Sequence, residues 1–235
     1  MPGSTYRERL AETLPRVREA IREAAVGVGR DPAGVRLVAV TKGHPAEAVT
    51  AAVEAGLTDL GENRIEELEE KIERLGRPAR WHFIGHLQSR KATRALAADL
   101  IHSVDSLKLA RRLARAAEEA GRSDVAVLLQ VNTSGEGSKS GFGADEAPEA
   151  LLEVVGLAPL RVQGLMTMAP FTEDQALVRR TFRGLRHLLD ALRAERPEVG
   201  GELSMGMSND LRVAVEEGST LVRIGTALFG ERESL

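Results

Sequence analysis

The first regular pattern along the chain is an apolar stripe near its amino terminus. Over residues 6–26 the apolar side chains recur at intervals of three and four positions, at Leu10, Leu14, Val17, Ile21 and Ala24. That spacing gathers them on one face of a helix, with charged residues on the opposite face. The pattern predicts an amphipathic helix that precedes the rest of the fold and packs against it.

Downstream, short β-branched and aliphatic runs alternate with stretches of helical spacing. The runs that predict strands are 35–40, 58–60, 80–84, 100–103, 125–131, 160–165, 202–205 and 221–224. The stretches between them that predict helices are 45–55, 65–75, 107–120, 146–155, 172–194 and 209–216. Strand and helix therefore alternate throughout the chain.

Such alternation is typical of parallel strands joined by right-handed crossovers, since a helix is the usual return path to a parallel neighbour. Eight strands in 235 residues favour an α/β fold, a closed (β/α)8 TIM barrel with an extra N-terminal helix. An open doubly wound sheet is the alternative, but its G-x-G-x-x-G fingerprint is missing after the first strand. No low-complexity linker divides the chain, so we expect a single domain over residues 1–235.

Composition and charge narrow the classes of function. A net charge of −3 gives no general reason to bind nucleic acid, and no run is long and apolar enough to span a membrane. Residues 1–10 are polar and charged where a signal peptide would be apolar. The absence of cysteine excludes disulfides, thiolate metal sites and a thiol nucleophile, and it is compatible with a reducing compartment. We expect a cytoplasmic protein without nucleic-acid, membrane or metal partners.

Polar residues stand at the ends of several predicted strands, where barrels of this class carry their chemistry. Lys42 follows the first strand, Asn63 the second and Asn132 the fifth, and His82 lies within the third. Because the carboxyl ends of parallel strands meet at one mouth, we expect these side chains to converge there.

Lys42 is the candidate for covalent chemistry. Burial at a strand end disfavours an ammonium group, which lowers the pKa of a lysine and makes the neutral amine available for an imine. The alternative is a lysine that reaches the rim or pairs with Glu62. The other four lysines are weaker candidates. A solvated role in or near a helix is expected for Lys71, Lys91 and Lys108, and Lys139 lies in a glycine-serine loop.

The last predicted strand ends in a turn suited to an anion. Gly225 allows backbone amides to approach a ligand closely, and phosphate sites after strands seven and eight are common in this fold. A short helix after Gly225 and Thr226 could direct its N-terminus at the anion. Ser208, which follows the preceding strand, is also a natural N-cap for the helix at 209–216. The conjunction of these three residues on neighbouring strands favours a phosphate site.

Arg223 places a guanidinium inside a strand that should be buried. A buried arginine keeps its charge and must find an acceptor. One interpretation is structural pairing with a carboxylate. The other is donation to the ring nitrogen of a bound cofactor.

These residues lie in segments that resemble the YggS/PROSC family of pyridoxal 5'-phosphate (PLP) homeostasis proteins, which share the fold-type III barrel of alanine racemase. The resemblance runs nearly end to end, over the segments LVAVTK at 37–42, GEN at 61–63, WHFIGHLQS at 81–89, QVN at 130–132, KSGF at 139–142, GLM at 164–166, LSMGMS at 203–208 and VRIGT at 222–226. Many family members carry a second lysine two positions after the first, where this chain has His44.

The resemblance implies a cofactor and a role for each candidate residue. The cofactor is PLP, and the residues that bind it are Lys42 (attachment as a Schiff base), Arg223 (ring nitrogen), Ser208, Gly225 and Thr226 (phosphate), and Asn63 and His82 (pocket lining). The resemblance further implies a protein that holds PLP reversibly and hands it to PLP-dependent apo-enzymes. Such a protein contributes to vitamin B6 and amino-acid homeostasis without clear catalytic turnover.

The main alternative is a PLP-dependent amino-acid racemase. Racemisation needs an acid/base on each face of the substrate, and in alanine racemase the second is a tyrosine from an additional β domain. Tyr6 is the only tyrosine here, and it stands far from the strand ends in the sequence. An arginine at the ring nitrogen also weakens the cofactor as an electron sink. A third interpretation, a phosphate-binding barrel such as an isomerase, keeps Gly225 and Thr226 but leaves Lys42 without PLP.

Overall fold

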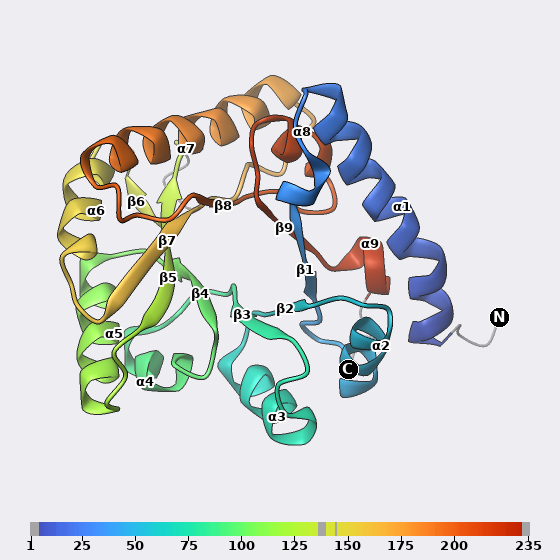
Figure 1. Cartoon of the computed structure of the whole chain (residues 1–235), viewed down its shortest axis with the longest axis horizontal. Helices are drawn as coiled ribbons and strands as arrows, with labels where there is room; N and C mark the ends of the chain where they lie inside the picture. Colours follow the sequence, from blue (N-terminus) through green and yellow to red (C-terminus); the bar gives the residue numbers. More distant parts are fainter. Residues whose placement is uncertain (1–4, 136–139, 144, 232–235) are drawn as a thin grey trace.

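The eight predicted strands form and pair in parallel around a closed ring (Figure 1). The computed structural model describes residues 5–135, 140–143 and 145–231. The strands of the ring are β1 (Arg36–Val40), β2 (Asp59–Glu62), β3 (Arg80–Phe83), β4 (Leu100–Val104), β5 (Val125–Asn132), β7 (Leu160–Met166), β8 (Glu202–Ser204) and β9 (Leu221–Ile224). Their bounds agree with the sequence pattern to within a few residues.

Two parallel pairings complete the ring, one between its first and last strands and one between two strands that follow each other along the chain. β1 pairs with β9, the last strand, and β4 pairs with β5, so the order β4-β3-β2-β1-β9-β8-β7-β5 returns to its start. A two-residue strand that the sequence did not predict, β6 (Phe142–Gly143), pairs with the end of β5 outside the ring. The fold is therefore the predicted (β/α)8 barrel, and the open sheet is excluded.

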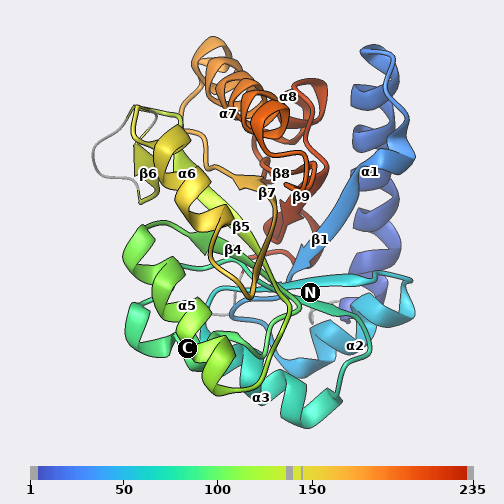
Figure 2. The same ribbon diagram turned by 60° about the vertical axis from the view of Figure 1, so that its left-hand side comes forward.

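Helices cover the outside of the ring (Figures 1 and 2). Their bounds are α1 (Tyr6–Gly27), α2 (Ala46–Glu54), α3 (Ile65–Leu75), α4 (Ala92–Ala95), α5 (Leu107–Glu119), α6 (Ala147–Val155), α7 (Gln175–Glu195), α8 (Leu211–Glu216) and α9 (Thr226–Phe229). Of these only the single-turn α4 lacked a sequence signal. Across the described residues, no helix combines the length and the apolar character needed to cross a membrane.

The N-terminal helix α1 is held against the last helices of the barrel. Thr5 and Glu8 form a capping box at its start, which satisfies two backbone N–H groups that the helix leaves unpaired. Its apolar stripe is buried along α2, α8 and α9. Thr13 donates a hydrogen bond to the carbonyl of Leu228 at 2.9 Å, and Arg9 donates to that of Phe229. These contacts fix α9, which follows the candidate phosphate turn.

The interior of the ring is partly apolar and partly polar. Five buried apolar side chains form a cluster inside it: Val38, Leu100, Leu128, Met166 and Leu221. Alongside them the strands bury His82, His102, Ser204 and Arg223, each at most 5% exposed. Buried polar groups are costly unless they are hydrogen-bonded, so these side chains require partners inside the barrel.

A buried ion pair fixes the carboxyl end of β1. Lys71 on α3 places Nζ 2.6 Å from Glu62 Oε1 at the end of β2, and it also donates to the carbonyl of Thr41 at 2.8 Å. The Thr41 hydroxyl donates to the same carboxylate oxygen at 2.5 Å. The prediction that Lys71 is solvated is wrong, because its side chain crosses from α3 to the strand ends and is buried there.

We predict that Lys71→Met destabilises the fold by about 3–5 kcal/mol at pH 8, because it leaves a buried carboxylate without its cation. Burial raises the pKa of Glu62 to about 7 even with Lys71 in place, and loss of Lys71 raises it further. A carboxyl whose pKa is raised by folding contributes its full stability below the unfolded pKa and loses it as the pH rises through the folded pKa. Urea unfolding should therefore show a smaller loss at pH 5 than at pH 8.

Two variants serve as controls for this experiment. Combining Glu62→Gln with Lys71→Met removes both charges and should recover most of the lost stability. Lys91→Met breaks the more exposed pair with Glu66, whose Oε1 lies 2.8 Å from Lys91 Nζ, and should cost much less stability than Lys71→Met. Equal losses for the two lysine variants would contradict a special role of the buried pair.

Candidate functional site

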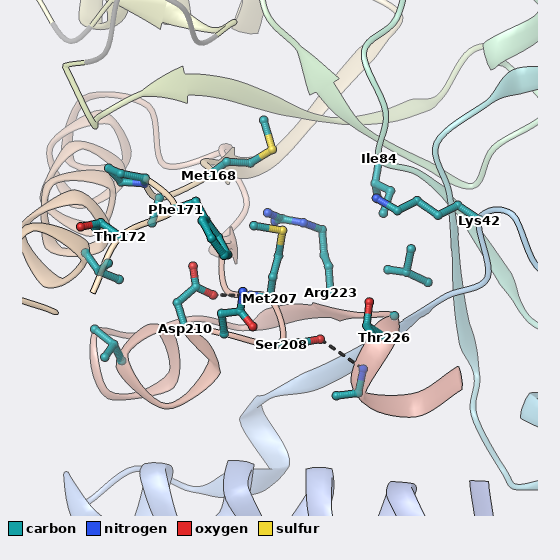
Figure 3. A pocket seen from close by; sticks show the side chains of 18 of the residues that line it. Lys42, Ile84, Met168, Phe171, Thr172, Met207, Ser208, Asp210, Arg223 and Thr226 are labelled. Atoms are coloured by element: carbon teal, nitrogen blue, oxygen red, sulfur yellow. Dashed lines mark hydrogen bonds between the residues drawn. The ribbon is translucent and has the colours of Figure 1, made fainter. Parts of the chain in front are cut away.

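A cavity of about 1140 Å³ opens at the carboxyl ends of the strands. Six of the seven candidate residues line it: Lys42, Asn63, Ser208, Arg223, Gly225 and Thr226. Figure 3 shows Lys42 and Arg223 reaching into this space from different elements, above the turn that holds Thr226. Asn132 does not join them, because it lines a separate cavity of about 490 Å³ with Thr133 and Arg180. The expectation that all four strand ends share one mouth is therefore wrong for Asn132.

Lys42 enters the cavity from the end of β1. Its side chain is half-buried and points towards Ile84 and the interior of the cavity (Figure 3). Thr41, immediately before it, is held through both its hydroxyl and its carbonyl by the Glu62–Lys71 pair. Glu62 is thus engaged by Lys71 and Thr41, and the alternative in which it pairs with Lys42 is not realised. Lys139, a weaker candidate for the imine, lies outside the described residues.

Arg223 presents a positive charge to the cavity, and the carboxylate of Asp210 in the cavity lining acts on that charge electrostatically. Its Nη1 donates to the hydroxyl of Ser204 at 2.6 Å and its Nη2 to the carbonyl of Thr167 at 3.0 Å, and within the described part of the chain it forms no ion pair. Burial lowers the pKa of Arg223 to about 10, so the side chain remains a cation at neutral pH. The structural interpretation, pairing with a carboxylate, is not observed.

The turn after β9 lies close to β1, so that a side chain there would be tightly packed. A Cβ atom added at Gly225 would lie 3.3 Å from the carbonyl oxygen of Val40 and 3.4 Å from its Cβ. Ser208 is linked to the same turn, since its Oγ accepts a hydrogen bond from the backbone N–H of Ala227 at 3.4 Å. Its predicted N-cap role is wrong, because α8 begins at Leu211 with Asp210 before it and Ser208 instead faces α9.

Asn63 supplies an unsatisfied acceptor. It lines the cavity, and its Oδ1 is buried without a hydrogen-bond partner among the described residues. Buried polar atoms in folded proteins almost always have a partner. An unpaired amide oxygen at the wall of a cavity therefore indicates a position at which a ligand or water completes the hydrogen bonding.

His82 does not line the cavity. It is fully buried inside the ring, where its Nε2 lies 2.9 Å from Asp59 Oδ1 and its Nδ1 lies 2.8 Å from His102 Nε2. His102 Nδ1 lies 2.8 Å from the Ser204 hydroxyl that accepts from Arg223. His82 is therefore joined to the cavity only through other side chains. His102 and Ser204 were missed, although a histidine within the apolar run at 100–103 was the available signal.

Tyr6 lies much closer to the site than its position in the sequence suggested. Its hydroxyl is 3.1 Å from Nδ1 of His44, and its ring packs edge-on against that imidazole with centroids 5.7 Å apart. His44 is buried, lines the cavity and stands two positions after Lys42. Helix α1 thus brings the tyrosine to the edge of the site through His44, a contact that the sequence separation concealed.

Apolar side chains edge the mouth of the cavity. Phe171 is 94% exposed, and Met168 and Met207 are also exposed. All three line the cavity and lie on segments that follow β7 and β8 (Figure 3). The mouth is consequently open to solvent and bordered by apolar groups.

Comparison with known proteins assigns the chain to a family. The model of the alanine racemase N-terminal domain matches residues 15–233. Proteins named pyridoxal phosphate homeostasis protein are 48% identical in Pseudomonas aeruginosa, over 95% of this chain and 96% of that protein, and 40% identical in Escherichia coli K12, over 95% and 97%.

Solved structures agree with the sequence comparison. PipY of Synechococcus elongatus, in a structure described as having PLP bound, superposes with a TM-score of 0.79 at 38% identity over 91% of this chain and all of that one. A protein of unknown function from Bifidobacterium adolescentis superposes with a TM-score of 0.90 at 37% identity, over 95% and 96%. An alanine racemase from Clostridium difficile, 14% identical with a TM-score of 0.79, shares the fold alone. With relatives this similar over nearly their full length, the chain belongs to the pyridoxal phosphate homeostasis protein family, on the barrel fold of the alanine racemase N-terminal domain.

Proposed function

We propose that this protein binds PLP reversibly, with Lys42 as the point of attachment, and stores and delivers it without turning over a substrate. The observation that carries the proposal is the convergence of a lysine amine, a buried guanidinium and a turn without a side chain on one cavity. The relatives named pyridoxal phosphate homeostasis proteins and the PLP-bound structure of PipY support it.

The residues present fit this cofactor. PLP carries an aldehyde, a ring nitrogen and a phosphate. A primary amine, a buried cation and a closely approached backbone turn are the matching groups, and Lys42, Arg223 and Gly225 supply them. The unpaired Oδ1 of Asn63 offers one further acceptor in the same cavity.

Each residue has a defined task in this proposal. When bound, PLP supplies an electrophilic aldehyde. The amine of Lys42 would hold it as an imine, formed with loss of water and reversed by hydrolysis. Arg223, a permanent donor, points a hydrogen at the ring nitrogen and so favours an unprotonated ring. Ser208, Gly225 and Thr226 hold the phosphate, and Asn63 lines the pocket. His82 acts behind Arg223 rather than at the cofactor.

The wider setting of the protein is part of the proposal. The open, apolar mouth supports release of PLP to PLP-dependent apo-enzymes and a contribution to vitamin B6 and amino-acid homeostasis. We propose that residues 1–235 act as one PLP-binding domain. A cytoplasmic location stays a prediction that rests on the cysteine-free sequence.

The attachment point can be identified directly. After incubation with PLP and reduction with borohydride, mass spectrometry of the peptides should find the adduct on Lys42. Lys42→Ala should lose the visible absorption band of a protonated PLP imine. Lys91→Ala, which removes an amine from a surface ion pair, should keep the band and the adduct. An adduct on Lys139, or no adduct in the wild type, would refute the assignment.

The phosphate site predicts a difference between PLP and pyridoxal, which lacks the phosphate. Thr226→Val removes one hydroxyl while keeping the shape, and should weaken PLP binding by roughly 3- to 10-fold, the value of one net hydrogen bond. Pyridoxal binding should not change. Thr50→Val, which removes a hydroxyl from the outer helix α2, is the matched control. Equal weakening of both ligands would place the phosphate elsewhere.

The contact between Tyr6 and His44 favours a racemase as the second candidate, since it brings a tyrosine hydroxyl to the edge of the site. We nevertheless expect no enzyme-like turnover, because the hydroxyl reaches the cavity only through the imidazole. Proton NMR of L-alanine incubated with the PLP-loaded protein in D2O should show neither D-alanine nor rapid loss of the α-proton. Fast exchange that Tyr6→Phe abolishes would establish the racemase instead.

A further inference from the structure

A continuous chain of side-chain hydrogen bonds crosses the inside of the barrel. It consists of Asp59, His82, His102, Ser204 and Arg223, and we refer to these residues as the interior chain. The consecutive distances are 2.9, 2.8, 2.8 and 2.6 Å. The interior chain begins at the first residue of β2 and ends at the cavity wall, and all of its members are buried.

The direction of every hydrogen bond in the interior chain follows by elimination. The Asp59 carboxylate can only accept, so His82 must carry its hydrogen on Nε2. A neutral His82 then accepts at Nδ1, which requires His102 to donate from Nε2. A neutral His102 in turn accepts at Nδ1 from the Ser204 hydroxyl. This leaves the Ser204 oxygen to accept from Arg223, which can only donate.

The surroundings keep each member in the required charge state. Burial lowers the pKa of His82, and it lowers that of His102 still further, with the nearby charge of Arg223 acting in the same direction. Burial alone would raise the pKa of Asp59, but hydrogen bonds from His82 and Thr58 outweigh it and lower that pKa. Both histidines are therefore neutral, and the terminal carboxylate is ionised, at neutral pH.

We propose that Asp59, His82, His102 and Ser204 are positioning residues that commit one edge of the Arg223 guanidinium to the barrel interior, so that its remaining donors face a ring acceptor in the cavity. The proposal deepens the proposed function, because the ring acceptor is the one that PLP would supply. The second anchor of Arg223, the carbonyl of Thr167, fixes the other amino group. Both anchors of Arg223, the Ser204 hydroxyl and the Thr167 carbonyl, are neutral acceptors.

The carboxylate of Asp59 prevents the hydrogen bonds of the interior chain from reversing their donor-to-acceptor direction. An amide at position 59 could turn its NH2 towards His82 and donate. Both imidazoles would then adopt the opposite tautomer, and His102 would donate to Ser204. The Ser204 oxygen would face two donors and its own hydrogen would lose its acceptor. A buried carboxylate that sets a histidine tautomer is an established device in serine proteases, where replacing it with asparagine leaves the geometry intact but changes the tautomer.

The tautomers can be measured in the protein without PLP. Long-range proton–nitrogen NMR of the wild type should show His82 and His102 neutral and protonated on Nε2. Asp59→Asn should shift a detectable fraction of both rings to the Nδ1 tautomer, whereas Ser103→Ala should not. Ser103 is the matched control, because it is a buried hydroxyl adjacent to His102 that has no hydrogen-bond partner among the described residues. An Nδ1-protonated or charged His102 in the wild type would overturn the proposal.

The consequence for binding is tested with three probes. Asp59→Asn and Ser204→Ala should each weaken PLP and pyridoxal by the same factor, on the order of tenfold, because both ligands carry the ring. Inorganic phosphate should bind these variants as it binds the wild type. Ser103→Ala should change none of the three affinities. If Asp59→Asn and Ser204→Ala both bound PLP with wild-type affinity, the proposal would be overturned. A loss of affinity for PLP and inorganic phosphate but not for pyridoxal would also overturn it.

The two hypotheses fail in different ways. A wild type with the expected tautomers that binds no PLP would overturn the proposed function and would still support the direction of the interior chain. If Asp59→Asn does not fold, Ser204→Ala tests the same link from the other end while Asp59 keeps its charge. In that variant the tautomers should stay as in the wild type, and the ring-bearing ligands should still lose affinity.

Discussion

Backbone pairing between β1 and β9 joins the first and last strands of the ring, with Val38 opposite Arg223 and Ala39 opposite Ile224. The site depends on this register. It sets Lys42, just beyond β1, beside Gly225 and Thr226, just beyond β9, although these residues stand near opposite ends of the sequence. The approach is close enough that a side chain at Gly225 would press on Val40. A parallel barrel thus converts two distant strand ends into neighbouring walls of one cavity.

Two buried polar systems hold the two basic groups of the site. The ion pair of Glu62 with Lys71 is hydrogen-bonded to the hydroxyl and the carbonyl of Thr41, and so fixes the backbone from which Lys42 extends. The interior chain holds the guanidinium of Arg223 from behind. The carboxylates of both systems, Glu62 and Asp59, lie away from the cavity. The cavity therefore contains an amine and a cation, and among the described residues the arginine forms hydrogen bonds but no ion pair.

Helix α1 connects the outside of the barrel to the same cavity. It binds the carbonyls at the end of α9 through Arg9 and Thr13, and it places Tyr6 against His44. An element that the sequence indicated only as a leading amphipathic helix thus supports the turn after β9 and contributes an aromatic neighbour to the site. The packing of α1 therefore links residues that precede the eight β/α units to the mouth of the cavity.

The sequence by itself determined the eight strands of the ring and most of the helices, and it favoured the closed barrel, because alternating apolar runs and helical spacing depend on local periodicity and on the short list of ways to join parallel strands. It also pointed to Lys42, Arg223, Gly225 and Thr226, because polar or flexible residues next to buried strands are unusual. Only the tertiary structure decided which partner each side chain has. Lys71 turned out to be buried with Glu62, Ser208 faces α9 instead of capping α8, His82 lies behind Arg223, and Tyr6 reaches His44. These outcomes depend on contacts between side chains of different strands and helices. The periodicity along one segment does not determine which side chains of other segments it contacts.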